Sequence, residues 1–315
     1  MERRTIAELI FLYEHEHSFR DIYVEGPTDR AFVAGVLRRT GIVDVAVREI
    51  DVIDVPAEQL TELQFTSGNR QRVIALAIVL ERRTKVNLAS RVICIADADA
   101  ENEAARSRSA LLLYTDVNSM PVYSFQEPYI QWYLDVQLLG FPKTAEQIID
   151  SLVPILKQVA VVRRAMIKLG VSASPPSIEA DCQVDGSAIT FYLDRFVTRC
   201  LNKAGRADLL EAIHVETTSH DWLLPQDFQT WVNADDFLDL LHWLIVRHRR
   251  NSNTVPRNLL GRTLLLGIPI SDAATWPLFG AVFSRLAPGN RQPGASNEVE
   301  PQQHERAKSD RTRRG

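Results

Sequence analysis

The order of apolar and polar residues changes near residue 125. Before that point, short apolar runs alternate with segments whose apolar residues recur at helical spacing. The pattern predicts strands at 21–25, 45–55, 91–96 and 110–115, and helices at 5–17, 28–41 and 68–85. Strands that alternate with helices are typical of βαβ units. We therefore expect residues 1–125 to form an α/β domain with a mostly parallel sheet flanked by helices.

From residue 126 to residue 286 the apolar spacing is nearly all helical. It predicts a mainly helical C-terminal domain with helices at 127–139, 144–170, 187–205, 235–250 and 272–286. The segment 235–250 is apolar on more than one face, which is typical of a helix in the core or in an interface. Residues 287–315 are polar and rich in Pro, Gly, Gln and Arg, so we expect a disordered tail.

Composition narrows the class of protein. The chain has 315 residues, of which 45% are hydrophobic and 24% charged, as in an ordinary globular protein. Its apolar runs are shorter than a membrane span, and charges interrupt the apolar run near the start, so we expect no membrane association and a cytoplasmic location. The net charge of −4 means that nucleic acid would have to be bound by a local basic patch.

Glu25 and Asp29 are close together in the sequence, at the end of the predicted strand 21–25. Glu25 ends the strand, Gly26 and Pro27 favour a turn, and Thr28 is a candidate N-cap for the helix that carries Asp29. In a parallel sheet, ligands bind outside the carboxyl ends of the strands. The pattern is therefore typical of a ligand site, although an exposed glutamate and a helix-start aspartate would also explain it.

A second acidic group follows the strand at 91–96. Asp97 and Asp99 come directly after it, and Glu101 and Glu103 follow. Carboxylates that cluster without a cation repel one another, and Mg²⁺ prefers oxygen ligands. A solvated acidic loop is the alternative. Because both groups follow strands of one βαβ arrangement, the sequence favours a divalent metal site at that edge of the sheet.

These residues resemble the motifs of a known family. The segments VEGPTDRAF at 24–32 and CIADADA at 94–100 are similar to the EGxxD and DxD motifs of TOPRIM domains, which occur in topoisomerases, bacterial primases and nucleases related to the overcoming-lysogenization-defect proteins. Shorter segments at 68–73, 112–120 and 235–245 resemble the small TOPRIM effectors that accompany an ABC-type ATPase in the PARIS anti-phage defence system. The narrower resemblance covers most of residues 15–250.

The chain departs from the pattern of these effectors at two places. Pro121 stands where the family has a glutamate, and Asn233, Ala234 and Asp235 precede Asp236 where the family has Gly-His. Any accessory role of these two regions in metal binding or proton transfer is therefore left open, whereas the set of Glu25, Asp97 and Asp99 is unaffected.

The resemblance implies a TOPRIM fold and a phosphodiester hydrolase that depends on Mg²⁺ or Mn²⁺. It assigns Glu25 as general base or shared metal ligand, Asp29 as a further ligand, and Asp97 and Asp99 as the main metal ligands. A topoisomerase would need a strand-passing domain with a nucleophilic tyrosine. A primase would normally add a zinc-binding region, and the three cysteines lack the spacing for one. A nuclease that uses water as nucleophile is therefore the favoured interpretation.

The same resemblance implies partners. We expect a toxic effector of bacterial defence that cleaves RNA, such as tRNA, or DNA, that is controlled by an ABC-type ATPase, and that is a homodimer when active. Arg70 and Arg72 precede a helix near the expected active edge and are candidates for binding nucleic acid. The alternative is a non-catalytic TOPRIM-like module that docks on an ATPase partner.

Overall fold

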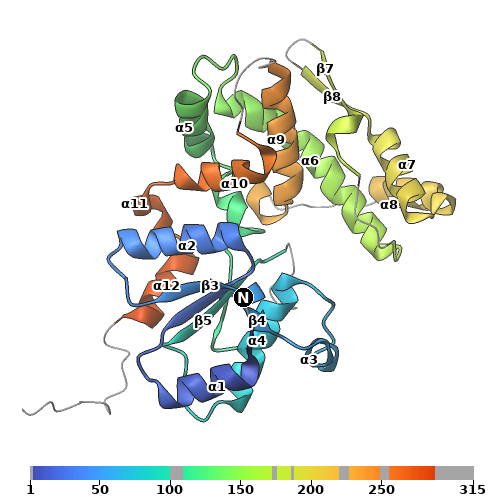
Figure 1. Ribbon diagram of the computed structural model, residues 1–315. Helices are drawn as coiled ribbons and strands as arrows, with labels where there is room; N and C mark the ends of the chain where they lie inside the picture. Colours follow the sequence, from blue (N-terminus) through green and yellow to red (C-terminus); the bar gives the residue numbers. More distant parts are fainter. Residues whose placement is uncertain are drawn as a thin grey trace, which may run out of the picture.

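The centre of the fold is a four-stranded parallel sheet, in the order β3-β2-β5-β6 (Figure 1). The computed structural model describes residues 3–99, 109–171, 176–185, 188–219, 227–248 and 255–287. The strands of the sheet are β2 (Asp21–Val24), β3 (Ala46–Glu49), β5 (Val92–Ala96) and β6 (Leu112–Tyr114). The predicted α/β class with a parallel sheet is thus confirmed.

Helices cover both faces of this sheet because its central strands are apolar on both sides. On β2, Ile22 and Val24 belong to one buried cluster and Tyr23 to the other. The first cluster includes the apolar residues of α2 (Pro27–Arg39) and α12 (Pro277–Leu286), and the second those of α1 (Ile6–His15) and α4 (Asn69–Arg83). A two-stranded parallel pair, β1 (Arg4–Thr5) with β4 (Ile53–Asp54), lies beside the sheet, and α3 (Ala57–Glu62) follows β4.

The rest of the chain is mainly helical, as predicted. Its elements are α5 (Glu127–Gln137), α6 (Ala145–Lys168), the hairpin of β7 (Cys182–Asp185) and β8 (Ala188–Phe191), α7 (Leu193–Ala204), α8 (Leu210–Ser219), α9 (Ala234–His248), α10 (Arg257–Leu266) and α11 (Ile270–Ala273). One of the two buried clusters continues from the sheet into this part without a break. None of the helices in the described ranges is long and apolar enough to cross a membrane.

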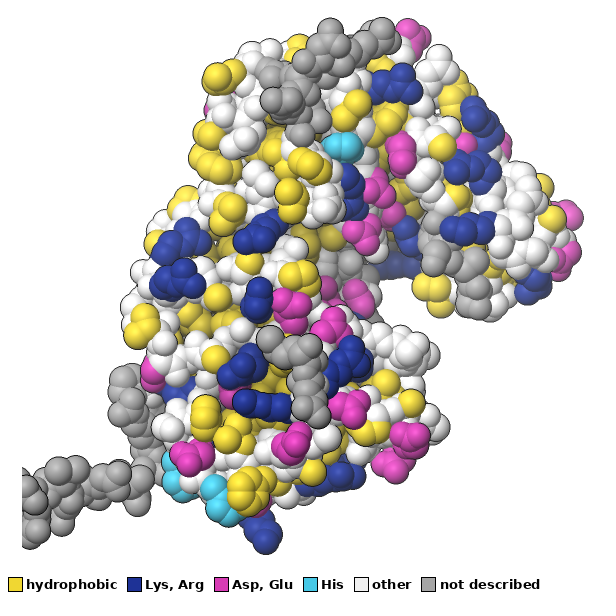
Figure 2. Space-filling model, in the orientation of Figure 1, with side chains coloured by type: hydrophobic (Ala, Val, Ile, Leu, Met, Phe, Trp, Pro, Cys, Tyr) yellow, Lys and Arg dark blue, Asp and Glu magenta, His cyan; other side chains and the backbone are white. Residues whose placement is uncertain are grey.

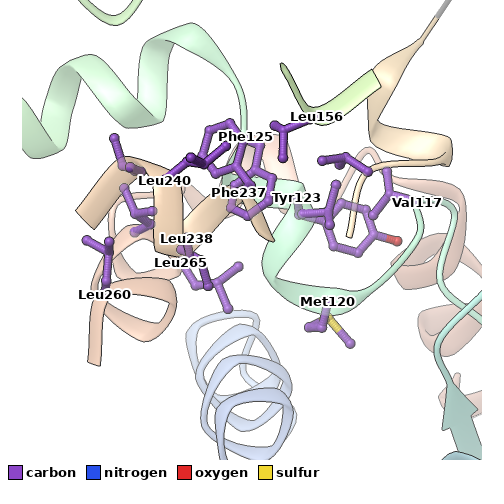
Figure 3. Close-up of a cluster of buried hydrophobic side chains, with 14 of the residues drawn as sticks. Val117, Met120, Tyr123, Phe125, Leu156, Phe237, Leu238, Leu240, Leu260 and Leu265 are labelled. Carbon is purple, nitrogen blue, oxygen red and sulfur yellow. The ribbon is translucent and has the colours of Figure 1, made fainter. Parts of the chain in front are cut away.

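Helix α9 lies at the centre of this shared core. The sequence left open whether its apolar residues belong to the core or to an interface, and the structure favours the core. Phe237, Leu240, Leu241 and Leu244 are fully buried. The ring of Phe237 stacks on that of Phe125, with 3.8 Å between the ring centroids (Figure 3). The apolar residues around this helix are therefore explained by packing within the chain.

Three predicted elements are divided in the structure. The predicted helix 187–205 begins only at Leu193, because the β-branched and aromatic residues before it form β8, whose side chains alternate in exposure as they pair with β7. The predicted helix 272–286 is interrupted, and α12 begins at Pro277, which suits the first turn of a helix. The segment 45–55 forms β3, a 3₁₀ turn at Ile50–Val52 and β4.

Helix α12 returns from the helical part to the sheet. The backbone N–H of Leu278 donates to Asp116 Oδ2 at 3.0 Å, and Arg20 Nη2 donates to the carbonyl oxygen of Leu286 at 2.6 Å. The rings of Phe279 and Phe32 meet edge to face at 5.8 Å between centroids. The last helix of the predicted helical domain therefore covers the α/β part. The predicted disordered tail lies outside the described residues from residue 288 onward.

Candidate active site

The two acidic motifs meet at the carboxyl edge of the sheet. Strands β2 and β5 are direct neighbours in parallel register, with Tyr23 opposite Cys94. Glu25 and Asp97 each follow the end of one of these strands, and Glu25 Oε1 accepts a hydrogen bond from the backbone N–H of Asp97 at 2.7 Å. The structure therefore brings together the residues that the sequence placed at one edge.

The turn after β2 fixes the position of Asp29. Gly26 is the N-cap of α2 and Pro27 its first residue, so the predicted N-cap at Thr28 is wrong by two positions. A proline at the first helical position has no N–H to satisfy and a suitable φ, which explains the earlier start. Asp29 Oδ2 accepts from the N–H of Gly26 at 3.1 Å, and this bond holds the buried carboxylate near Glu25.

The turn at residues 97–99 is held by the segment that follows β6. The N–H of Ala98 donates to Thr115 Oγ1 at 3.0 Å, and the N–H of Asp99 to the carbonyl oxygen of Asn118 at 2.9 Å. The N–H of Met120 donates to Asp97 Oδ1 at 3.1 Å. Sequence reasoning missed the contribution of Thr115, although its position at the end of the predicted strand 110–115 was a usable signal.

Asp99 has an unusual backbone. Its φ is 51°, in the left-handed region that aspartate enters more readily than most residues. Its side chain is 53% exposed, whereas Asp29 is buried and Glu25 and Asp97 are half-buried. Asp99 is therefore the member of the acidic set that is most open to solvent. Glu101 and Glu103 lie outside the described residues.

Arg70 reaches the acidic set, whereas Arg72 pairs with a different segment. Arg70 Nε donates to the carbonyl oxygen of Asp97 at 2.8 Å and lies 3.3 Å from Asp99 Oδ2. Arg72 instead donates to Asp51 Oδ1 at 2.6 Å and to the carbonyl oxygen of Ile53 at 2.8 Å. Arg72 thus ties α4 to the segment between β3 and β4, and its contact with nucleic acid stays a prediction.

The electrostatic state of the site follows from burial and mutual repulsion. Burial, with the charges of Asp29 and Asp99 added, raises the pKa of Glu25 to about 7, against the opposing effects of the Asp97 N–H and of Arg70. Burial also raises the pKa of Asp29 to about 6. Burial and the charges of the other three carboxylates hold the pKa of Asp97 well above its usual range. The carboxyl groups of Glu25, Asp29 and Asp97 therefore release their protons at a higher pH than free carboxyl groups do.

The donor set fits a hard divalent cation, but the described conformation does not enclose one. Carboxylate oxygens are the ligands that Mg²⁺ prefers. Each of the four carboxylates already has a partner within the chain, either a backbone N–H or Arg70. Within the residues that the structure describes, no three His, Cys, Asp or Glu side chains are grouped closely enough to hold a metal ion.

The two departures from the family pattern lie in packed regions. Asp236 is buried and accepts from Arg163 Nε at 2.8 Å, which joins α9 to α6. Burial raises the pKa of Asp236, and Arg163 opposes that rise. Pro121 comes directly after Met120, whose N–H donates to Asp97. It lies near Gly261 of α10, since a Cβ placed on this glycine would be 3.7 Å from the Cβ of Pro121. Asp236 therefore has a structural role as an ion-pair partner of Arg163, and Pro121 packs near α10.

Acidic and basic side chains are mixed on the face of the molecule that Figure 2 shows. Where the α/β part meets the helical part, acidic and basic side chains lie next to one another, and the outline of the molecule is indented there (Figure 2).

No protein-family model matches the chain, and no curated protein is significantly similar to it in sequence. The resemblance to TOPRIM domains therefore stays a prediction from the two acidic motifs of the sequence.

Proposed function

We propose that the chain is a TOPRIM-type nuclease that hydrolyses phosphodiester bonds of nucleic acid with the help of Mg²⁺ or Mn²⁺. The observation that carries the proposal is the gathering of Glu25, Asp29, Asp97 and Asp99 at the carboxyl edge of a parallel sheet. A fold gains nothing in stability from grouping half-buried like charges, so such a group is a candidate for function.

Each carboxylate has a role in this proposal. Glu25, whose pKa is raised to about 7 in the metal-free structure, is the general base for the attacking water or a shared metal ligand. Asp97, Asp99 and Glu25 would hold the metal ion, and Asp29 is a further ligand or keeps Glu25 poised through its charge. A bound metal ion would polarise the phosphodiester and stabilise the charge that develops on it.

The test is cleavage by the purified full chain of three substrates, namely tRNA, other RNA and DNA, with Mg²⁺, with Mn²⁺ and with EDTA. Asp97→Asn is expected to lower the rate by at least about 100-fold, because it weakens the charge stabilisation at the reacting phosphate. Asp54→Asn, at an exposed position on β4, is the matched control and should cleave normally. Full activity in EDTA would contradict the metal-dependent mechanism.

The alternative is a non-catalytic TOPRIM-like module that docks on an ATPase. It is favoured by one observation, namely that every carboxylate of the set is already engaged within the chain. Glu25→Gln separates the two candidates, because it retains an acceptor for the Asp97 N–H and removes the base. A folded Glu25→Gln protein that loses its toxicity in cells supports the nuclease, and one that stays toxic supports the binding module.

The proposal extends to partners, location and biological setting. It includes bacterial defence against phage, an ABC-type ATPase that silences the chain, a homodimer as the active form and a cytoplasmic location. The structure offers exposed apolar side chains for contacts, with Val136 at 52%, Leu139 at 76% and Leu266 at 64% exposure. Light scattering and native pull-down test these partners, and a monomer recovered without an ATPase would contradict both.

A further inference from the structure

Arg70 is a buried cation at the carboxylate edge. Its side chain is 9% exposed, and it belongs to the first turn of α4, a turn that contains no acidic residue. The positive end of the helix dipole disfavours a cation there. Arg70 therefore needs compensation from elsewhere, and the carboxylates of the site supply it.

The contacts of Arg70 with other described residues include members of the site and their support. Nε donates to the carbonyl oxygen of Asp97 and pairs with Asp99, and the guanidinium carbon lies 5.9 Å from the centroid of the Tyr114 ring. The charge of Arg70 also lowers the pKa of Glu25. The guanidinium thus supplies, from within the chain, part of the positive charge that a metal ion would bring.

We propose that Arg70 is an internal counter-cation that pairs with Asp99 in the metal-free state and has to release this carboxylate before a divalent ion is bound. This inference rests on the proposed function, and concerns the regulation of the same site. Asp99 is suited to the exchange because it is more than half exposed and because its backbone is in a sparsely populated conformation, which makes a change of position less costly.

The exchange has a direct consequence for metal affinity. If Asp97 and Asp99 held a divalent ion, Asp99 would have to give up its pairing with Arg70, and the buried charge of Arg70 would stay close to these ligands. Both effects oppose binding, and the repulsion between the two cations is weakly screened because Arg70 is buried. Removal of this charge should therefore strengthen metal binding, whereas loss of an ordinary supporting residue would weaken it.

The experiment measures Mn²⁺ binding to the full chain by electron paramagnetic resonance of the free ion, without substrate. Arg70→Gln should bind Mn²⁺ about tenfold more tightly than the unmodified protein, the factor that a change of about 1.4 kcal/mol produces. Arg70→Lys keeps the charge and should stay within about threefold of the unmodified protein. Arg82→Gln removes a charge from the exposed end of the same helix and should change nothing.

A second measurement uses the unmodified protein, so its result does not depend on whether a variant folds. The ¹⁵Nε–¹Hε signal of Arg70 should shift when Mg²⁺ is added, because its pairing with Asp99 ends, while that of Arg72 should stay in place. An Arg70 signal that does not respond to saturating Mg²⁺ would overturn the exchange.

The outcomes separate this inference from the proposed function. Equal or weaker Mn²⁺ binding by Arg70→Gln overturns the role of Arg70 and leaves a metal-dependent nuclease intact. An Arg70→Lys protein that binds as tightly as Arg70→Gln shows that charge is not the cause, and also overturns the inference. Absence of Mn²⁺ binding in every protein overturns the inference and the proposed function together.

Discussion

Glu25→Gln is expected to stabilise the folded protein above about pH 7 while it removes the proposed base. In the fold the pKa of Glu25 rises from 4.5 to about 7. One pKa unit corresponds to about 1.4 kcal/mol, so ionisation of Glu25 costs the folded state about 3 kcal/mol at a pH above both values. Glutamine avoids this cost and can still accept the Asp97 N–H.

The sign of the pH dependence follows from the raised pKa. Between about pH 4.5 and pH 7 the folded state binds more protons than the unfolded state, so the free energy of unfolding falls as the pH rises through this window. The gain from Glu25→Gln should therefore be below about 1 kcal/mol near pH 5 and about 3 kcal/mol near pH 8.

The measurement is urea denaturation in EDTA near both pH values, which gives the free energy of unfolding from the midpoint and the slope. Glu58→Gln, at an exposed position on α3, is the matched control and should show no gain that grows with pH. A Glu25→Gln protein that is destabilised, or equally stabilised at both pH values, would refute the claim that the folded site is strained by ionised Glu25.

Three further changes test other parts of the structure by the same denaturation measurement. Thr115→Val removes the buried acceptor of the Ala98 N–H, so we expect a loss of about 1–3 kcal/mol, and Thr115→Ser should recover most of it. Asp236→Asn leaves Arg163 with a weaker partner and should cost about 3 kcal/mol, near the low end for a broken buried pair because Arg163 is partly exposed. Phe237→Ala removes a fully buried ring from the shared core and should cost about 3–5 kcal/mol, and a loss below about 1 kcal/mol would place α9 outside the core.

The carboxyl edge could be predicted from the sequence because it needs only that the two strands are parallel. Once the segments at 21–25 and 91–96 are identified as parallel strands, Glu25 and Asp97 have to leave the sheet on the same side. Adjacency of the two strands was the remaining step, and the hydrogen bond between Glu25 and the Asp97 N–H shows that they are neighbours.

The different roles of Arg70 and Arg72 could not be predicted in the same way. The two residues are two positions apart on α4, which turns their side chains by roughly 200° relative to each other. Arg70 consequently faces the 97–99 turn, and Arg72 faces the segment between β3 and β4. Which of them reaches the site depends on the rotation of the helix on the sheet, and that rotation is set by packing.

The segment that forms strand β8 was wrongly predicted to be part of a helix. Its four residues precede α7 without a break in apolar character, so helical spacing alone extends the helix backwards. The hairpin partner β7 ends only three residues before β8 begins. A short pairing of this kind competes with helix extension through cross-strand contacts that a periodicity search does not count.

Under the proposed function, the charge of the acidic edge would set stability and function against each other. Three agents can neutralise the carboxylates, namely protons, the guanidinium of Arg70 and a divalent ion. Protons are bound because burial raises the pKa values of Glu25 and Asp29. Arg70 compensates only in part, since these pKa values stay raised although the guanidinium pairs with Asp99. The remaining uncompensated charge is what a divalent ion would neutralise, so a site that is costly to the free fold is, for the same electrostatic reason, prepared to bind a cation.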